Sequence, residues 1–315
     1  MSTVETTRPP AAVSPPGRPV TKRPPSPTRS GWLFTAPFVV LYLAFLIGPA
    51  LYNLVVSFFD TSLVRPGLGA FAGLDNYGDV LTDAEFWRTF GHTVWFTVLT
   101  TVPLVVISLA LALLVQNFSR GRWFLRLAFF APYVLPSAVI AIVWRYIYQD
   151  EMGGLAALVG WFGITPPSFL GDPAWAMASI ALATVWWTVG FNFVLYLAAL
   201  QEIPQEVHEA SALDGAGPWQ RIRYVIVPLL GRTTALVLLL QAIASLKVFD
   251  QIFIMTGGGP DGSTRASLNY IYDTGFTDYR VGYASAAAVL FFLFVLAVSL
   301  VWARVNRRAE DGNRP

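Results

Sequence analysis

Cysteine is absent from the 315 residues, and histidine occurs only twice, at His92 and His208. A chain without cysteine can form neither a disulfide framework nor a thiolate metal site, and two histidines are too few for a metal cluster or a histidine-based catalytic set. His208 stands beside Glu209, where no substrate pocket is expected, so a solvated or interfacial histidine fits better than a general acid or base. We expect no catalytic residue, no metal and no cofactor in this chain.

Charged residues are also scarce. They make up 13% of the chain, hydrophobic residues make up 55%, and the mean hydropathy is +0.55. Soluble domains carry about a quarter charged residues, so this composition indicates an integral membrane protein. The net charge is +2, and the basic residues are scattered around apolar segments without forming one face, so we expect no nucleic-acid partner.

Nucleotide-binding and enzyme motifs are missing as well. The run 257–259 is Gly-Gly-Gly, but no Gly-Lys-Ser/Thr follows it, so it is not a phosphate-binding loop. Apolar segments contain no clustered histidine, cysteine or paired carboxylates, which argues against a membrane enzyme. If ATP drives this protein, it must bind to another subunit.

Six stretches are long enough to cross a bilayer, which takes about 20 mostly apolar residues. Each should be a helix, because lipid offers no partners to an open backbone. The sequence therefore predicts an all-α, polytopic membrane protein. The predicted spans are residues 33–56, 93–115, 125–148, 175–200, 229–254 and 283–303. Pro132 and Pro136 should break or kink the third span.

The charges between the spans predict an orientation, because Lys and Arg are retained on the cytoplasmic side. The N-terminal 30 residues, the second and fourth connections and the C-terminus are basic, whereas the first and third connections are acidic. Both termini should therefore face the cytoplasm. The basic residues of the later segments are Arg120, Arg122, Arg126, Arg221, Arg223, Arg232, Arg304, Arg307, Arg308 and Arg314; the acidic residues are Asp60, Asp75, Asp79, Asp83, Glu85, Asp150, Glu151 and Asp172.

Two segments lie outside the predicted membrane domain of residues 31–305. Residues 1–30 are rich in proline and arginine and contain little to bury, which is typical of a disordered tail. A signal peptide is the alternative, but the apolar run that follows is too long for a cleaved one. Residues 306–315 form a short cytoplasmic C-terminal tail.

The most patterned polar segment, residues 204–228, separates two long apolar stretches. Pro204 suits a helix start, and Gly215 suits a left-handed stop, so a helix is predicted over 205–213. Pro218 then begins a second helix, and the segment should be a helix-turn-helix. Small residues would allow a close approach by another surface, with charged groups beside them. On the second helix, Trp219, Ile222, Val225 and Ile226 should share one side.

Three pieces of this segment carry a family resemblance: Glu209-Ala210-Ser211, Asp214-Gly215-Ala216, and Ile226 with Pro228. They resemble the "EAA" coupling loop of ABC importer permeases, the membrane subunits of binding-protein-dependent transporters. Ser211 stands where that pattern has a second alanine, and Arg232 stands where many members carry proline. Residues 256–260 and 282–286 resemble the carbohydrate branch, typified by maltose and glycerol-phosphate importers.

The resemblance covers residues 31–305 and implies the fold of a type I ABC importer in a bacterial or archaeal cell membrane. It also implies a second homologous permease, two ATPase subunits that hold ATP and magnesium, and an extracytoplasmic solute-binding protein. Six spans would then supply half of a pathway for a carbohydrate or polyol. The residues expected to couple to the ATPase are Glu209, Ala210, Ser211, Asp214, Gly215, Ala216 and Gly217.

Polar and aromatic residues within the spans are the candidates for the substrate path. The main candidates are Trp186, Trp187, Thr188, Asn192, Ser245, Lys247 and Asp250, followed by Phe130, Tyr133 and Ser137 on weaker grounds. Packing is the alternative for each aromatic residue. Lys247 and Asp250, three residues apart, are predicted to form an internal ion pair. An ion- or proton-coupled secondary transporter remains the alternative function, although we find neither an internal repeat nor central carboxylates.

Overall fold

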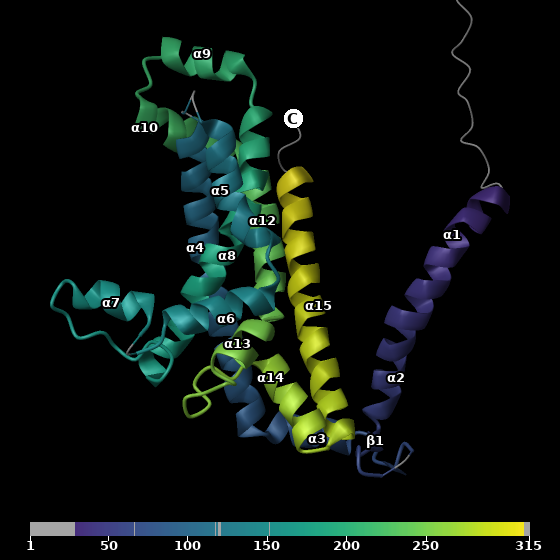
Figure 1. The fold of residues 1–315 in the computed structure, drawn as a ribbon. Coiled ribbons are helices and arrows are strands. Elements are labelled where there is room, and N and C mark those ends of the chain that lie inside the picture. The colour runs from purple at the N-terminus through teal and green to yellow at the C-terminus, as the bar shows by residue number, and fades with distance from the viewer. Residues whose placement is uncertain (1–28, 66, 117, 119–120, 151, 312–315) are drawn as a thin grey trace, which may run out of the picture. The chain divides into compact units, whose positions relative to one another are not determined.

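The computed structural model describes residues 29–311, apart from residues 66, 117, 119–120 and 151. The predicted tail of residues 1–30 and the last four residues thus lie almost wholly outside the described part. Apart from turns and loops, the described chain is helical except for one short antiparallel ribbon, in which β1 (Phe59–Asp60) pairs with β2 (Ala70–Phe71) (Figure 1). The chain divides into two compact units, residues 1–50 and 51–315.

The first predicted span begins in the first unit. It consists of α1 (Arg29–Tyr42), a π-helical turn η1 (Leu43–Ile47) and α2 (Gly48–Val56). The apolar part, Phe34–Val56, is long enough to cross a membrane and agrees with the predicted span within one residue. In the π-turn the N–H of Gly48 donates to the carbonyl of Leu43, one residue further back than in an α-helix.

Three further spans are unbroken helices: α4 (Ala84–Gln116), α8 (Pro173–Gln201) and α15 (Val281–Asp311). All three contain a window apolar enough to cross a membrane. α8 begins where Asp172 caps it, because the carboxylate accepts the N–H of Ala174 and Pro173 occupies the first turn. α4 and α8 pack along each other and form the centre of the second unit.

The third predicted span is broken. α5 (Arg122–Val134) and α6 (Ser137–Ile147) meet at an angle of 98°. The break falls at Leu135 and Pro136, because a residue before proline is driven out of the α-helical region, and Leu135 has ψ 144°. The predicted break is confirmed at Pro136, whereas Pro132 lies within α5.

The prediction of a single helix for the fifth span, 229–254, was wrong. α10 (Pro218–Arg221), a π-turn η2 (Ile222–Ile226) and α11 (Val227–Leu229) lead at 65° into α12 (Gly231–Leu246). α12 stops at Lys247, and α13 (Asp250–Met255) begins a new direction. Asp250 lies in the first turn of α13. A negative side chain is stabilising at the N-terminus of a helix, so Asp250 favours the start of a new helix here over the continuation of α12.

The connections carry short helices. These are α3 (Asp75–Thr82), α7 (Gly154–Gly160), α9 (Gln205–Leu213), α14 (Ser267–Tyr272) and the π-turn η3 (Asp273–Thr277). In Figure 1, α9 and the end of α15 lie at one end of the second unit, and α3 and α14 lie at the other. We call these the α9 end and the α3 end. Within the described residues, four helices are long and apolar enough to be spans, or up to six when each bent pair counts as one, in agreement with the predicted polytopic fold.

The core divides along the length of α8. Toward the α3 end, Phe96, Ile140, Ile180 and Ile252 belong to one buried cluster formed by α4, α6, α8 and α13. Toward the α9 end, a second cluster joins α4 and α8 to the start of α12; its buried members include Ala112, Val115, Phe193, Tyr196, Leu200, Ile226 and Val237. The break between α11 and α12 lies within the second cluster, because Leu230 is one of its buried members.

Candidate functional site

The segment 204–228 forms the predicted helix-turn-helix at the α9 end. α9 spans Gln205–Leu213, the predicted bounds. Gly215 has φ +74°, the left-handed conformation expected of it, and the N–H of Ala216 donates to the carbonyl of Ser211 at 3.1 Å to close the turn. A Cβ on Gly215 would meet nothing within 4 Å, so glycine is required here by backbone conformation and not by space.

Most of the predicted coupling residues lie on the surface of this element. Glu209, Ala210, Asp214 and Gly215 are exposed, and Ala216 and Gly217 are half-buried. Ser211 differs from the others, because it is buried and its hydroxyl donates to the carbonyl of His208 at 2.8 Å. Its side chain thus supports α9 from within.

Two features of this element escaped the sequence analysis. Leu213, at the end of α9, has 90% of its surface exposed, and an apolar residue closing a polar helix was the available signal. Trp219 is 70% exposed, although it was predicted to share a side with Ile226, which is buried. The π-turn η2 adds a residue to one helical turn, so the spacing used for that prediction does not hold.

A cavity of about 540 Å³ lies beside the α5–α6 break and the gap between α12 and α13, and we call it the bend cavity. It is formed by the α5–α6 break, the middle of α8 and the α12–α13 break. Five of the seven predicted path residues line it, namely Trp187, Thr188, Ser245, Lys247 and Asp250; the weaker candidates Tyr133 and Ser137 line it too.

Two predicted path residues lie elsewhere. Trp186 packs edge-to-face on Trp144, with ring centroids 5.6 Å apart, on another side of α8. Asn192 is fully buried, and its Oδ1 accepts from Nε2 of Gln241 at 3.0 Å. Gln241 itself lines the bend cavity, so Asn192 stands behind a lining residue.

An aromatic wall forms one side of the bend cavity. The ring of Tyr133 stacks on Phe191 at 5.1 Å and lies 6.3 Å from Trp187. The indole N–H of Trp187 donates at 3.1 Å to the carbonyl of Leu135, which the break has freed from helical hydrogen bonding. The same bond therefore fixes the ring of Trp187 and satisfies the backbone at the bend. Phe191 was missed, although it follows Trp187 by one helical turn.

Polar groups also line the bend cavity. The hydroxyl of Ser137 donates to Asp250 Oδ2 at 2.5 Å, and the hydroxyls of Thr100 and Ser245 are hydrogen-bonded at 2.8 Å. The predicted ion pair between Lys247 and Asp250 is wrong: no ion pair joins them in the described chain. Lys247 ends α12 and Asp250 begins α13, so the two do not share one helix, as that prediction required.

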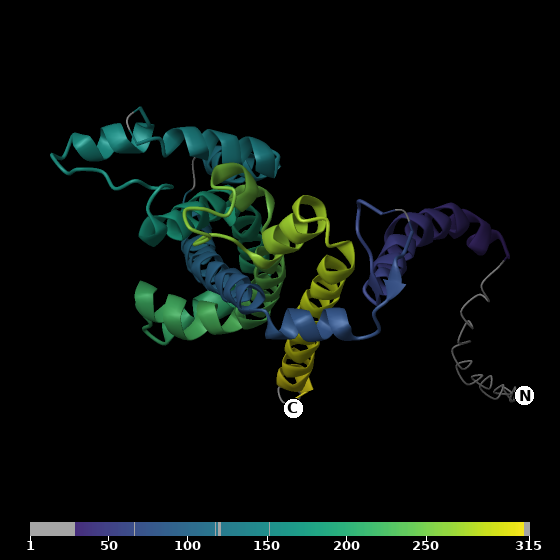
Figure 2. The ribbon, with the colours of Figure 1, turned by 90° about the horizontal axis from the view of Figure 1, so that it is seen from below.

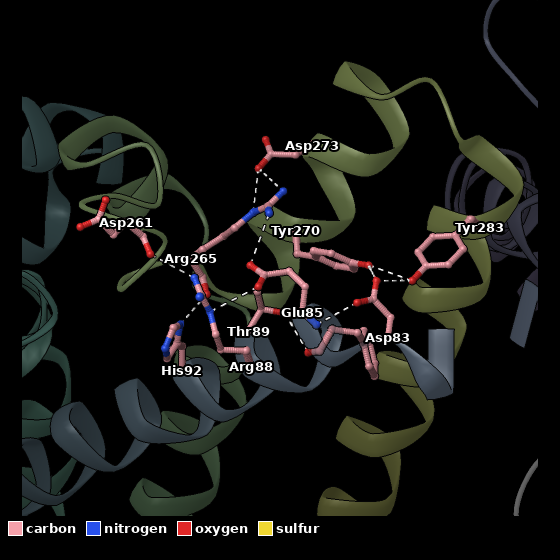
Figure 3. Close-up of polar contacts among 11 residues, drawn as sticks. Asp83, Glu85, Arg88, Thr89, His92, Asp261, Arg265, Tyr270, Asp273 and Tyr283 are labelled. Carbon is pink, nitrogen blue, oxygen red and sulfur yellow. Dashed lines mark hydrogen bonds and ion pairs between the residues drawn. The ribbon is translucent and has the colours of Figure 1, made fainter. Parts of the chain in front are cut away.

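At the α3 end, a polar network joins the start of α4 to α14 and α15 (Figure 3). Asp83 Oδ2 accepts from the hydroxyls of Tyr270 at 2.5 Å and Tyr283 at 2.7 Å. Partial burial raises the pKa of Asp83, but these bonds and the N–H groups of Glu85 and Phe86 outweigh it, so the pKa lies below its ordinary value. Burial, with the Asp83 carboxylate, raises the pKa of Tyr270 to about 12.

Arginines extend the same network. Arg265 pairs with Asp273 at 2.8 Å and with Glu85 at 3.6 Å, and Arg88 pairs with Glu85 at 3.3 Å. Arg88 also donates to the carbonyl of Asp261 in the glycine-rich turn. The turn of residues 256–265 is thereby fixed to α4.

Comparison with known proteins identifies the family. Residues 104–311 match the family described as "Binding-protein-dependent transport system inner membrane component". The trehalose/maltose transport system permease protein MalF of Thermococcus litoralis is 34% identical over 89% of this chain and 95% of its own length. The sulfoquinovosyl glycerol transport system permease protein SmoG of Agrobacterium fabrum is 32% identical over 88% of this chain and 90% of its own length.

Solved structures agree on the fold. A chain of a bacterial ABC transporter involved in the import of alginate superposes with a TM-score of 0.76 and 24% identity, covering 89% of this chain and 96% of that one. The alginate transporter in complex with a pentasaccharide-bound periplasmic protein gives 0.78 at 22% identity, over the same shares. The all-α, six-span fold expected from the sequence is thus the fold of an ABC importer permease. The chain belongs to the family of inner-membrane components of binding-protein-dependent transport systems.

Proposed function

We propose that this chain is the permease subunit of an ATP-driven importer and forms half of the translocation pathway for a carbohydrate or polyol. The bend cavity carries the proposal, because its lining combines an aromatic wall with a lysine, a carboxylate and several hydroxyls. Flat aromatic rings suit the C–H face of a sugar, and the polar groups suit its hydroxyls. The names of the two relatives, which refer to trehalose, maltose and sulfoquinovosyl glycerol, support this substrate class.

The proposed partners are a second homologous permease, two ATPase subunits and an extracytoplasmic solute-binding protein. ATP and magnesium would bind to the ATPase subunits. The alginate transporter crystallised with a periplasmic protein, which supports a solute-binding partner here. Because one chain has one α9 element, two permeases would provide one docking element for each ATPase.

The proposed topology places both termini and α9 in the cytoplasm of a bacterial or archaeal cell. The basic connections support it, and so does the position of α9 and the end of α15 at the same end of the second unit (Figure 1). The domain assignment follows: a tail over 1–30, a permease domain over 31–305 and a C-terminal tail over 306–315.

Coupling would run from α9 through α8 to the bend cavity. Closure of the ATPase pair on nucleotide would draw the two α9 elements together. α8 ends three residues before α9 begins, and it carries Trp187 and Thr188 of the cavity on one unbroken helix. A displacement of α9 would therefore reach the cavity wall along a rigid element. ATP and substrate are coupled only if they favour different states of this arrangement.

The test is uptake by the assembled transporter in vesicles that contain ATP. Gly215→Pro should abolish uptake without preventing membrane insertion, because proline requires φ near −65° and Gly215 has φ +74°. Glu209→Lys should also abolish uptake, since it reverses an exposed charge of the docking surface. Gly163→Pro imposes the same backbone conflict, with φ +72°, in the loop after α7 and serves as the matched control.

Two results would contradict the proposal. One is normal uptake by the Gly215→Pro variant. The other is uptake that follows an ion gradient and persists without ATP, which would favour the secondary transporter.

A further inference from the structure

The loop between α6 and α8 contains an unusual helix. Residues 152–171, which we call the α7 loop, contain no Asp, Glu, Lys or Arg, although Asp150, Glu151 and Asp172 flank them. α7 itself reads Gly-Leu-Ala-Ala-Leu-Val-Gly and is followed by Trp161 and Phe162. A helix that is apolar on every side is stable either within a protein core or in a membrane.

Protein covers only one side of this helix. Ala156 is buried, and Leu155 and Val159 pack against the core cluster of α4, α6 and α8. The opposite side holds Leu158, Trp161 and Phe162, at helical spacings of three and four, with 54%, 87% and 74% of their surfaces exposed. No described part of the second unit covers this outward stripe.

The base of the loop is fixed, so the exposure is not that of a frayed segment. Phe169 is buried against Tyr148, with ring centroids 5.4 Å apart, and the hydroxyl of Ser168 donates to Asp150 at 2.8 Å. α7 is thus held by its inner side and by both ends of the loop, while its outer side stays open.

Along the direction from the α3 end to the α9 end, α7 lies at the same height as the membrane spans (Figure 1). In Figure 1, α7 projects sideways level with α6, between the α3 end, which carries the polar network, and the α9 end. Figure 2 also shows it extending beyond the bundle, on the other side of the second unit from α15. The side of α6 that faces outward is apolar as well, with Val139, Ile142, Val143 and Tyr146 exposed.

We propose that the α7 loop lies in the leaflet nearer the α3 end, with Leu158, Trp161 and Phe162 in contact with lipid. An interfacial helix buries apolar side chains at the boundary of headgroups and acyl chains, where Trp and Phe are favoured. A docking surface for a soluble protein would need polar groups around its apolar centre, because it must be hydrated when free. The α7 loop offers none between residues 152 and 164. The loop thus widens the footprint of the bent third span in the bilayer.

The absence of cysteine makes the test direct, because one introduced thiol is unique in the chain. Phe162→Cys is spin-labelled in the assembled transporter, in vesicles of phosphatidylethanolamine and phosphatidylglycerol. Collision of the label with oxygen, which partitions into lipid, is compared with collision with a water-soluble nickel chelate. Asp79→Cys, at an exposed position of α3, is the aqueous control. We expect the oxygen-to-nickel ratio to shift toward oxygen at position 162 relative to position 79.

The other outcomes overturn the proposal. A ratio at position 162 equal to that at position 79 means that the loop lies in water. Low collision rates with both reagents mean that a protein, such as a second permease, covers the stripe. If Phe162→Cys fails to assemble, Trp161→Cys, in the same stripe, gives the same comparison.

Discussion

The straight and bent spans of this permease differ in what they contribute. α4 and α8 run unbroken beside each other, whereas α5 and α6 meet at 98° and α12 ends before α13 begins, and both of these breaks line the bend cavity. Each break frees backbone groups and brings polar side chains such as Ser137, Lys247 and Asp250 into the membrane domain. The straight spans therefore supply rigidity and most of the aromatic wall, and the breaks of the bent spans supply the charged groups of the bend cavity. The comparison predicts which substitutions should damage assembly and which should damage transport.

The largest effect is expected where a straight span touches a bent one. Gly190 of α8 lies against α5, and a Cβ there would stand 2.1 Å from the carbonyl oxygen of Phe129 and 2.8 Å from Cα of Phe130. These are backbone atoms, so they cannot yield without moving α5. Gly190→Val should lower the free energy of unfolding of the subunit by about 3 kcal/mol or more, which is the upper end of the cost of overpacking a core. This loss should prevent assembly.

The measurement is the amount of monodisperse transporter and its unfolding temperature. Gly91→Ala is the control, because it adds a Cβ to α4 at a position with nothing within 4 Å. A Gly190→Val variant that assembles and unfolds like the wild type would show that α5 and α8 are not rigidly packed.

The next effect is expected inside the bend cavity. Lys247 has no ion-pair partner in the described chain, so its ammonium group is available to substrate hydroxyls. Hydrogen bonds to charged groups are worth about 1.5–3 kcal/mol, so Lys247→Ala should raise the KM for uptake roughly tenfold or more. Lys247→Arg keeps the charge and is the matched control. An unchanged KM together with a lower unfolding temperature would assign Lys247 to structure.

How far the sequence foretold these features depends on the range of the interactions. α9 was predicted to the residue because Pro204 and Gly215 act locally, and the break at Pro136 follows from proline chemistry alone. The orientation of Trp186 away from the cavity was not predictable, since it depends on the packing of α8 against α6. The separation of Lys247 from Asp250 was missed because nothing local marks the end of α12. The prediction that Trp219 shares a side with Ile226 was also wrong, because the π-turn η2 changes the number of residues per helical turn between them.

A smaller effect is expected at the Trp187 indole, which links straight α8 to the bend. Trp187→Phe keeps an aromatic face but leaves the carbonyl of Leu135 without its donor. Losing one such bond costs about 1 kcal/mol, so the variant should show a several-fold loss in uptake rate and a slightly lower unfolding temperature. Trp186→Phe is the matched control, because Trp186 lies outside the bend cavity. Equal losses in both variants would mean that the bend does not depend on this bond.

The smallest effect is expected at the α3 end, where Asp83 ties the start of α4 to α15. Asp83→Asn keeps one acceptor oxygen but loses charge-assisted bonds, which should cost about 1 kcal/mol in unfolding free energy with uptake unchanged. Because the native pKa of Asp83 lies below its ordinary value of 3.8, the carboxylate stabilises the protein above that pH, and this contribution is lost as the pH falls through the native pKa. The difference in unfolding temperature between wild type and variant should thus be the same at pH 6 and pH 8. A difference that changes between these two values would show that another group controls the network.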